Sequence, residues 1–161
     1  MPKKIFQSLH DIQLKEVKVV ELFIKSKQRP VQTVGVASAQ FSISAEHGEY
    51  DAKNKSIHVL TTAEAGMDDI TETPYSIRVR IVGFFSVDDE KFDSQNIDHW
   101  AKNNAPAILY PFLREHVYAL TARCGFEPAI LPLVVLPTLV PKKKTAATAK
   151  KTAVASQSNA G

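Results

Sequence analysis

The sequence is short of the residues that build reactive and redox sites. Its 161 residues include one cysteine, Cys124, five histidines that stand apart from one another, and six scattered glycines. A single cysteine excludes an intrachain disulfide and suits a reducing cytoplasm. No HxxxH or CxxC spacing indicates a metal site, and no glycine-rich loop indicates a phosphate site. We therefore expect no catalytic residue, no cofactor and no metal, which argues against an enzyme.

Long apolar runs are also missing. The most apolar window, residues 131–140, has about half the length that a membrane-spanning helix needs, and it contains two prolines. The N-terminus carries lysines but no apolar stretch of signal-peptide length after them. These features predict a cytoplasmic protein without stable membrane insertion.

Charge is unevenly distributed along the chain. The formal net charge is +3, but residues 142–161 contain five lysines and no acidic residue. The twenty basic residues therefore leave fifteen against seventeen acidic ones in residues 1–141, a balance of −2. We expect one folded domain over residues 1–141 and a disordered Lys/Ala/Thr-rich tail over 142–161. A solubilising tail is favoured over nucleic-acid or lipid binding, because no aromatic residues lie between the lysines.

Alternating apolar residues predict four strands in the first two thirds of the chain. The first covers residues 11–25, and a change of phase near Lys15 and Glu16 suggests a bulge. Further strands are expected at 31–45, 56–62 and 75–87, separated by a turn at 46–55 and an acidic loop at 62–74. The fourth strand is the clearest, since every second residue from Tyr75 to Val87 is apolar or glycine.

Helical spacing begins after the fourth strand. We expect a short helix over residues 93–101 and a longer one over 105–124, with Asn104 as its cap and Gly125 as its stop. Pro111 either kinks the long helix or marks its start. Four prolines make residues 126–141 extended and exclude a central strand there. Strands followed by helices indicate an α+β fold, an antiparallel sheet with helices on one face.

Two segments carry more apolar surface than one subunit needs. Five of the six residues from Val19 to Ile24 are apolar, so that a face left open by the helices requires a partner. This places Val20 and Leu22 in a predicted oligomer interface. A stripe rich in tyrosine and arginine on the long helix is typical of interfaces, and it adds Tyr110, Arg114, Tyr118 and Thr121. The alternative for this stripe is a solvated helix face.

Residues 83–135 contain a series of motifs in a recognisable order. They are Gly83-Phe84-Phe85-Ser86-Val87, then the run from Pro106 to Glu115 (PAILYPFLRE), then the exit from Arg123 to Pro128 (RCGFEP), and finally the apolar segment from Ala129 to Val135. In this order they resemble the SecB family of protein-export chaperones. The resemblance implies a four-stranded antiparallel sheet with two helices, assembled as a homotetramer that is a dimer of dimers. It also implies a hydrophobic groove for unfolded chains and no nucleotide.

A groove of this kind needs adaptable apolar surface, which aromatic side chains provide at low cost in conformational entropy. The candidate groove residues are Phe84, Trp100, Phe126, Ile130, Leu131, Leu133 and Val135. Alternation along the fourth strand places Phe85 toward the core, leaving Phe84 as the groove candidate. Any of these aromatic residues can instead belong to the core or to a subunit interface.

The resemblance also implies a function and shows one departure from the family. It implies an ATP-independent holdase for unfolded preproteins of the Sec translocase, whose motor SecA docks on acidic residues of the sheet. Glu16 matches one acidic position, but Arg78 stands where a second carboxylate is expected, and a reversed charge would repel a basic partner. The alternatives are a SecB-like chaperone dedicated to the antitoxin of a toxin–antitoxin system, a nucleic-acid-associated protein that acts through its tail, and an oligomerisation subunit without clients.

Overall fold

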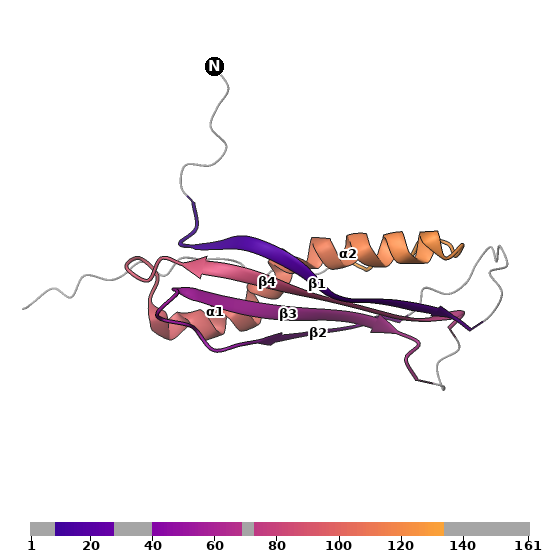
Figure 1. Cartoon of the computed structure of the whole chain (residues 1–161), viewed down its shortest axis with the longest axis horizontal. Helices are drawn as coiled ribbons and strands as arrows, with labels where there is room; N and C mark the ends of the chain where they lie inside the picture. Colours follow the sequence, from indigo (N-terminus) through magenta and orange to yellow (C-terminus); the bar gives the residue numbers. More distant parts are fainter. Residues whose placement is uncertain (1–8, 28–39, 69–72, 134–161) are drawn as a thin grey trace, which may run out of the picture.

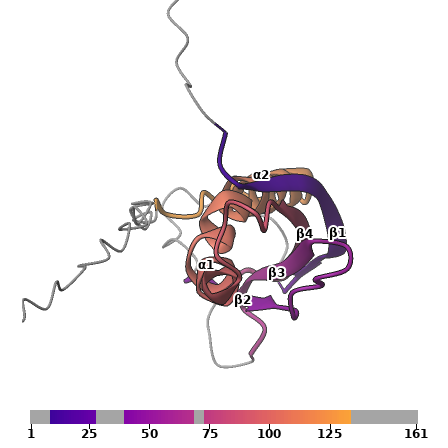
Figure 2. The same ribbon diagram turned by 90° about the vertical axis from the view of Figure 1, so that its left-hand side faces the viewer.

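The strands form a single four-stranded antiparallel sheet. The computed structural model describes residues 9–27, 40–68 and 73–133. Its strands are β1 (Ile12–Ser26), β2 (Ser42–His47), β3 (Ser56–Ala65) and β4 (Tyr75–Val87), in the order β1-β4-β3-β2 across the sheet. A 3₁₀ turn, η1 (Ser94–Asn96), leads into α1 (Ile97–Asn103) and α2 (Ala105–Arg123). Figures 1 and 2 show both helices on one side of the curved sheet, which confirms the predicted α+β fold.

The centre of the sheet is β4, which pairs with β1 on one side and with β3 on the other. Every second residue from Tyr75 to Val87 points toward the helices and is buried, including Gly83, over which α2 approaches closely. A Cβ added at Gly83 would lie 2.5 Å from Cδ2 of Leu109. A glycine here therefore lets the helix pack directly on the strand.

The other strands differ in part from their predicted bounds. The bulge expected near Lys15 is present, and a second shift of register, between Val19 and Glu21, was not predicted. Strand β3 continues to Ala65 instead of ending at residue 62, because Ala63 and Ala65 extend its buried face. Strand β2 covers only Ser42–His47 of the strand predicted at 31–45, and residues 31–39 lie outside the described part of the chain.

The two predicted helices are present, with different details at their ends. The Asp93 side chain accepts the N–H of Gln95 at 3.1 Å and caps η1. Helix α2 runs through Pro111 from Ala105, so Pro111 does not mark its start, and Asn104 precedes it without a side-chain capping bond. Gly125 has a φ of 77° and ends the helix as predicted, because glycine adopts this left-handed conformation without a Cβ clash.

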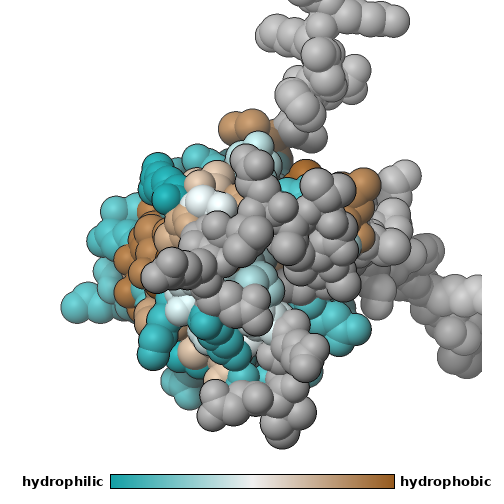
Figure 3. Space-filling view, turned by 90° about the vertical axis from the view of Figure 1, so that its right-hand side faces the viewer, coloured by the Kyte–Doolittle hydropathy of each residue, from teal (hydrophilic) through white to brown (hydrophobic). Residues whose placement is uncertain are grey.

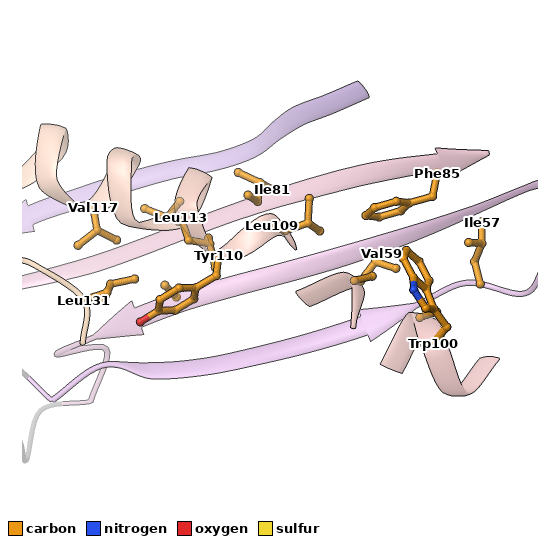
Figure 4. Close-up of a cluster of buried hydrophobic side chains, with 14 of the residues drawn as sticks. Ile57, Val59, Ile81, Phe85, Trp100, Leu109, Tyr110, Leu113, Val117 and Leu131 are labelled. Carbon is orange, nitrogen blue, oxygen red and sulfur yellow. The ribbon is translucent and has the colours of Figure 1, made fainter. Parts of the chain in front are cut away.

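Aliphatic side chains from the sheet and from α2 fill the core (Figure 4). Val59 and Ile81 from the strands meet Leu109, Leu113 and Val117 from α2 in one buried cluster. The segment after α2, residues 126–133, has no regular secondary structure, yet it contributes the fully buried Leu131. Within the described ranges, no helix has both the length and the apolarity to cross a membrane. The predicted tail, residues 142–161, lies beyond them.

Candidate functional site

Large apolar side chains stay exposed although the core is complete. They are found on β1, on the face of β4 that points away from the helices, on α2, and on residues 126–133, which we call the strap. The main ones are Val19, Val20, Leu22, Phe84, Ile108, Tyr118, Ile130 and Leu133, with Leu9, Ile43 and Met67 elsewhere. Figure 3 shows hydrophobic side chains gathered on the side of the molecule where β1 runs.

Strand β1 is an edge of the sheet and carries unpaired apolar surface. Val20 lies at the second register shift and is 52% exposed, and Leu22 is also exposed. Val19 and Leu22 are paired with the buried Ile81 and Val79 of β4, but α2 packs mainly over β3 and β4 and leaves them open. An exposed edge strand with apolar side chains is a ready surface for another strand.

Phe84 and Phe85 point to opposite faces of β4, as alternation predicted. Phe85 is 1% exposed, and its ring meets that of Trp100 edge-to-face at 5.1 Å. Phe84 is 36% exposed, with Nζ of Lys18 5.4 Å from its ring centroid and the His58 ring at 6.3 Å. The Phe84 ring is therefore an apolar surface bordered by a cation.

Trp100 does not lie on the surface, contrary to its prediction as a groove residue. It is only 4% exposed, since α1 folds back on the sheet and presses the indole against Phe85 and the His10 ring. Its Nε1 has no hydrogen-bond partner in the part of the chain that the structure describes. Trp100 therefore belongs to the core. The prediction that it contacts a client directly is corrected, because its side chain is not accessible in this conformation.

The strap is fastened to α2 by two side chains that were predicted for an oligomer interface. The hydroxyl of Tyr110 donates to the carbonyl of Pro132, and Oγ1 of Thr121 accepts the N–H of Ala129 at 2.9 Å. Thr121 Oγ1 also donates to the carbonyl of Val117 at 2.9 Å. Both side chains are buried inside their own subunit, so their assignment to a contact between subunits is wrong.

The remaining members of that helix stripe lie outside the strap contact. Tyr118 is exposed, and Arg114 is half-buried. Burial raises the pKa of the Tyr110 hydroxyl, and the nearby Arg114 charge opposes this rise. The neutral hydroxyl is the form that donates to Pro132, so the raised pKa is consistent with a lasting hydrogen bond.

The strap presents alternate faces to the core and to solvent. Leu131 is fully buried, so the prediction that it is an accessible groove residue is corrected. Ile130 and Leu133, in contrast, are 68% and 85% exposed. Phe126 is half-buried, with its ring 4.8 Å from that of Tyr75. Val135, also predicted for the groove, lies outside the described residues. The sequence offered no periodicity with which to separate the inward Leu131 from its neighbours.

The sheet face that points away from the helices carries paired charges. Arg78 Nε donates to Glu64 at 2.8 Å, Arg80 lies 3.9 Å from Glu21, and Lys18 lies 3.3 Å from Glu16. The expectation that Arg78 repels a basic partner assumed an unopposed charge, but Glu64 on β3 balances it. Among the described residues, no three His, Cys, Asp or Glu side chains gather as metal ligands do.

A family comparison identifies the type of protein. Residues 6–145 match the family model described as preprotein translocase subunit SecB. The chain belongs to the SecB family. This match confirms the resemblance seen in residues 83–135 and extends it over the strands of the first half. It also assigns this SecB-family chain to the protein-export chaperones.

Curated relatives agree with this membership. The protein-export protein SecB of Anaplasma phagocytophilum is 24% identical over 135 residues, which cover 80% of this chain and 83% of that protein. The Ehrlichia canis SecB is 26% identical over 144 residues, covering 80% of each chain. An uncharacterized protein of Methanocaldococcus jannaschii is 32% identical over 79 residues, 49% of this chain, and the matched region spans only half of that protein.

A solved structure shares the fold. It is the SecB-like chaperone of Mycobacterium tuberculosis in complex with a ChAD peptide from the HigA1 antitoxin. The TM-score is 0.61 with 18% sequence identity, and the match covers 79% of this chain and 93% of that one. At this identity, the likeness establishes the sheet-and-helix architecture of the SecB-family chain and nothing further.

Proposed function

We propose that this SecB-family chaperone is an ATP-independent holdase, which acts in the cytoplasm on unfolded preproteins destined for the Sec translocase. The observation that carries the proposal is the set of large apolar side chains, Phe84, Ile130 and Leu133 among them, that stay exposed around a filled core. Exposed apolar surface of this kind marks a contact with other chains. A holdase uses such surface without a catalytic step, a nucleotide or a metal.

The proposed client contacts lie on two parts of the molecule. On the strap they are Phe126, Ile130 and Leu133, and on the sheet the contact is Phe84 with Lys18 beside it. Flexible or isolated apolar side chains accept many client sequences, because they impose no shaped pocket. A long unfolded chain has the reach to contact both parts. Val135 remains a proposed contact from the sequence alone.

The oligomer that we propose is a homotetramer built as a dimer of dimers. The exposed edge of β1 supports a first contact, in which Val20 and Leu22 meet the same strand of a second copy. Tyr118 and Arg114 on the outer side of α2 supply the second contact. Burial of these side chains between copies removes apolar surface that a lone subunit leaves in water.

The sheet face around Glu16 and Arg78 is the proposed docking surface for SecA. Its ion pairs join Arg78 to Glu64 and Lys18 to Glu16, so that the face presents balanced charge. A basic partner meets acidic and basic groups there in equal measure, and docking depends on how these pairs rearrange.

A second candidate is a SecB-like chaperone dedicated to one antitoxin. The fold shared with a chaperone solved in complex with an antitoxin peptide favours this candidate. Proteins recovered with the chaperone from its native host separate the two: a range of export precursors supports the first function, and a single antitoxin supports the second.

The direct test is protection of an unrelated protein from aggregation. Chemically denatured client is diluted into buffer with or without the purified chaperone, and light scattering is followed in the absence of nucleotide. We expect suppression at or below one tetramer per client, unchanged by added ATP. Full aggregation at every ratio of chaperone to client overturns the proposed function.

A further inference from the structure

The strap is bound to α2 in the way that an extended peptide binds a receptor. It has no regular secondary structure, and one side chain, Leu131, is fully buried. Figure 4 places Leu131 at the end of the core that also holds Val117 and Tyr110. Its neighbours Ile130 and Leu133 point to solvent. One inward leucine between outward apolar residues is the arrangement of an anchored apolar peptide.

The hydrogen bonds of the strap recognise backbone rather than side chains. Tyr110 donates to the carbonyl of Pro132, and Thr121 accepts the N–H of Ala129 through its side chain. The N–H of Phe126 donates to the backbone carbonyl of Thr121 at 3.1 Å, but this bond belongs to the C-terminal cap of α2 at Gly125 and does not depend on the rest of the strap. Backbone groups are common to every polypeptide. The surface of α2 under the strap therefore suits any extended segment with a leucine-sized side chain at the anchor position.

We propose that this surface, formed by Tyr110, Thr121 and the Leu131 site, is an acceptor for an extended apolar segment of the client, and that the strap occupies it as an internal competitor. The proposal rests on the proposed holdase function. A client segment displaces the strap and seats its own apolar side chain where Leu131 lies. The strap keeps the apolar site filled when no client is present. It raises the apparent dissociation constant of the client in inverse proportion to the fraction of molecules whose site is free of the strap.

The amide of Ala129 reports on this exchange, because it donates to the side chain of Thr121, and the amide of Phe126, which is held in the cap of α2, serves as the reference. Hydrogen exchange at these two amides is measured in the intact chaperone, with and without a saturating, permanently unfolded client. Displacement of the strap frees the Ala129 amide, and we expect its exchange to become at least about tenfold faster, while that of Phe126 changes little. Unchanged or slower exchange of the Ala129 amide with client bound overturns the proposal, because it means that the client lies on top of a strap that stays in place.

A variant of the strap itself tests the competition from the other side. Leu131→Ala removes the buried anchor of the strap and leaves Tyr110 and Thr121, which the client also uses, unchanged. It is expected to weaken the strap and to lower the dissociation constant of the client about tenfold or more. Leu9→Ala is the matched control, since this exposed leucine precedes β1 and lies outside the strap, and no change is expected.

The outcomes separate the two proposals. A parent protein that does not suppress aggregation contradicts the holdase function. A parent that suppresses aggregation, with a folded Leu131→Ala variant that binds client no more tightly than the parent, overturns only the competition, because the strap is then a wall of the site. Thermal unfolding of each variant shows whether it is folded, and the exchange experiment needs no variant at all.

Discussion

Phe84 and Phe85 differ in surroundings although they are neighbours in the chain. The substitution Phe85→Ala removes a ring that packs against Trp100 in the core. We therefore expect a loss of about 3–5 kcal/mol in the free energy of unfolding. Phe84→Ala removes a partly exposed ring and is expected to cost roughly 1–2 kcal/mol from its contacts with Lys18 and His58. Urea unfolding measures both values.

The two variants should rank in the opposite order when suppression of client aggregation, rather than stability, is measured. At a temperature where both variants are folded, Phe84→Ala is expected to reduce the suppression of aggregation, while Phe85→Ala leaves it near that of the parent. Equal protection by Phe84→Ala and the parent would remove this side chain from the proposed client surface. The comparison is well matched, because the two residues are of one type and adjacent.

Tyr110 and Thr121 show how a single contact changes the interpretation of a residue. Both belong to a helix stripe of a type common at interfaces, and both instead hold the strap of their own subunit. Their polar groups are buried and satisfied within the chain. The spacing of residues along a helix thus shows which of them share a face. Whether that face contacts the strap or another subunit is decided by the tertiary structure.

Strand β1 is the element on which assembly depends. Val20→Lys places a charge on the exposed edge at the second register shift, where a second copy would bury it without a partner. We expect the dissociation constant of the oligomer to rise about 30-fold or more, which corresponds to the loss of an interface hot spot. Light scattering coupled to size-exclusion chromatography measures the mass of the oligomer over a dilution series, which gives its dissociation constant.

The other edge of the sheet supplies the control for this substitution. Ile43→Lys changes an exposed apolar residue of β2 to the same charged residue, and it should leave the oligomer unchanged. If Ile43→Lys dissociates the oligomer and Val20→Lys does not, β2 rather than β1 forms the contact. If neither changes the mass, assembly does not use the strand edges.

The stability of the whole molecule should depend on pH through its buried tyrosines. Burial raises the pKa of Tyr75 and of Tyr110 above the ordinary value. The folded state therefore favours the neutral phenol, and this contribution is complete below pH about 10, the ordinary tyrosine pKa. As pH rises further, the unfolded chain ionises first, so the free energy of unfolding falls until the pH passes the folded pKa.

Tyr75→Phe tests this dependence. The variant lacks one of the tyrosines whose pKa is raised, and its free energy of unfolding should fall less steeply than that of the parent between about pH 9 and pH 11. Urea titrations at a series of pH values give both slopes. Identical slopes would show that the Tyr75 hydroxyl ionises alike in the folded and unfolded chains.

Opposite charges on the sheet face that points away from the helices are paired by residues distant in the sequence. Glu64 and Arg78 are fourteen residues apart and meet because β3 and β4 pair in register. Glu21 and Arg80 are brought together in the same way by β1 and β4. A charge count along the sequence does not reveal these pairs, and the sheet face they form is close to neutral.

Local pattern was sufficient for the elements whose own residues set their structure. Alternation predicted β4 with its bounds and separated Phe84 from Phe85, while helical spacing and Gly125 predicted the course and end of α2. The order of strands and helices determined the fold class, and the motifs of residues 83–135 pointed to the SecB family. These features depend on backbone periodicity and on conformations that one residue type favours, both of which are present in the sequence.

Tertiary contacts decided which apolar residues are available to another chain. Trp100 and Leu131 are buried because α1 and the strap fold back on the sheet and on α2. The second register shift left Val20 exposed at the sheet edge, and Glu64 neutralised Arg78 from a neighbouring strand. Burial and ion pairing are properties of residues distant in the chain that meet in space, and local spacing contains no information about such meetings.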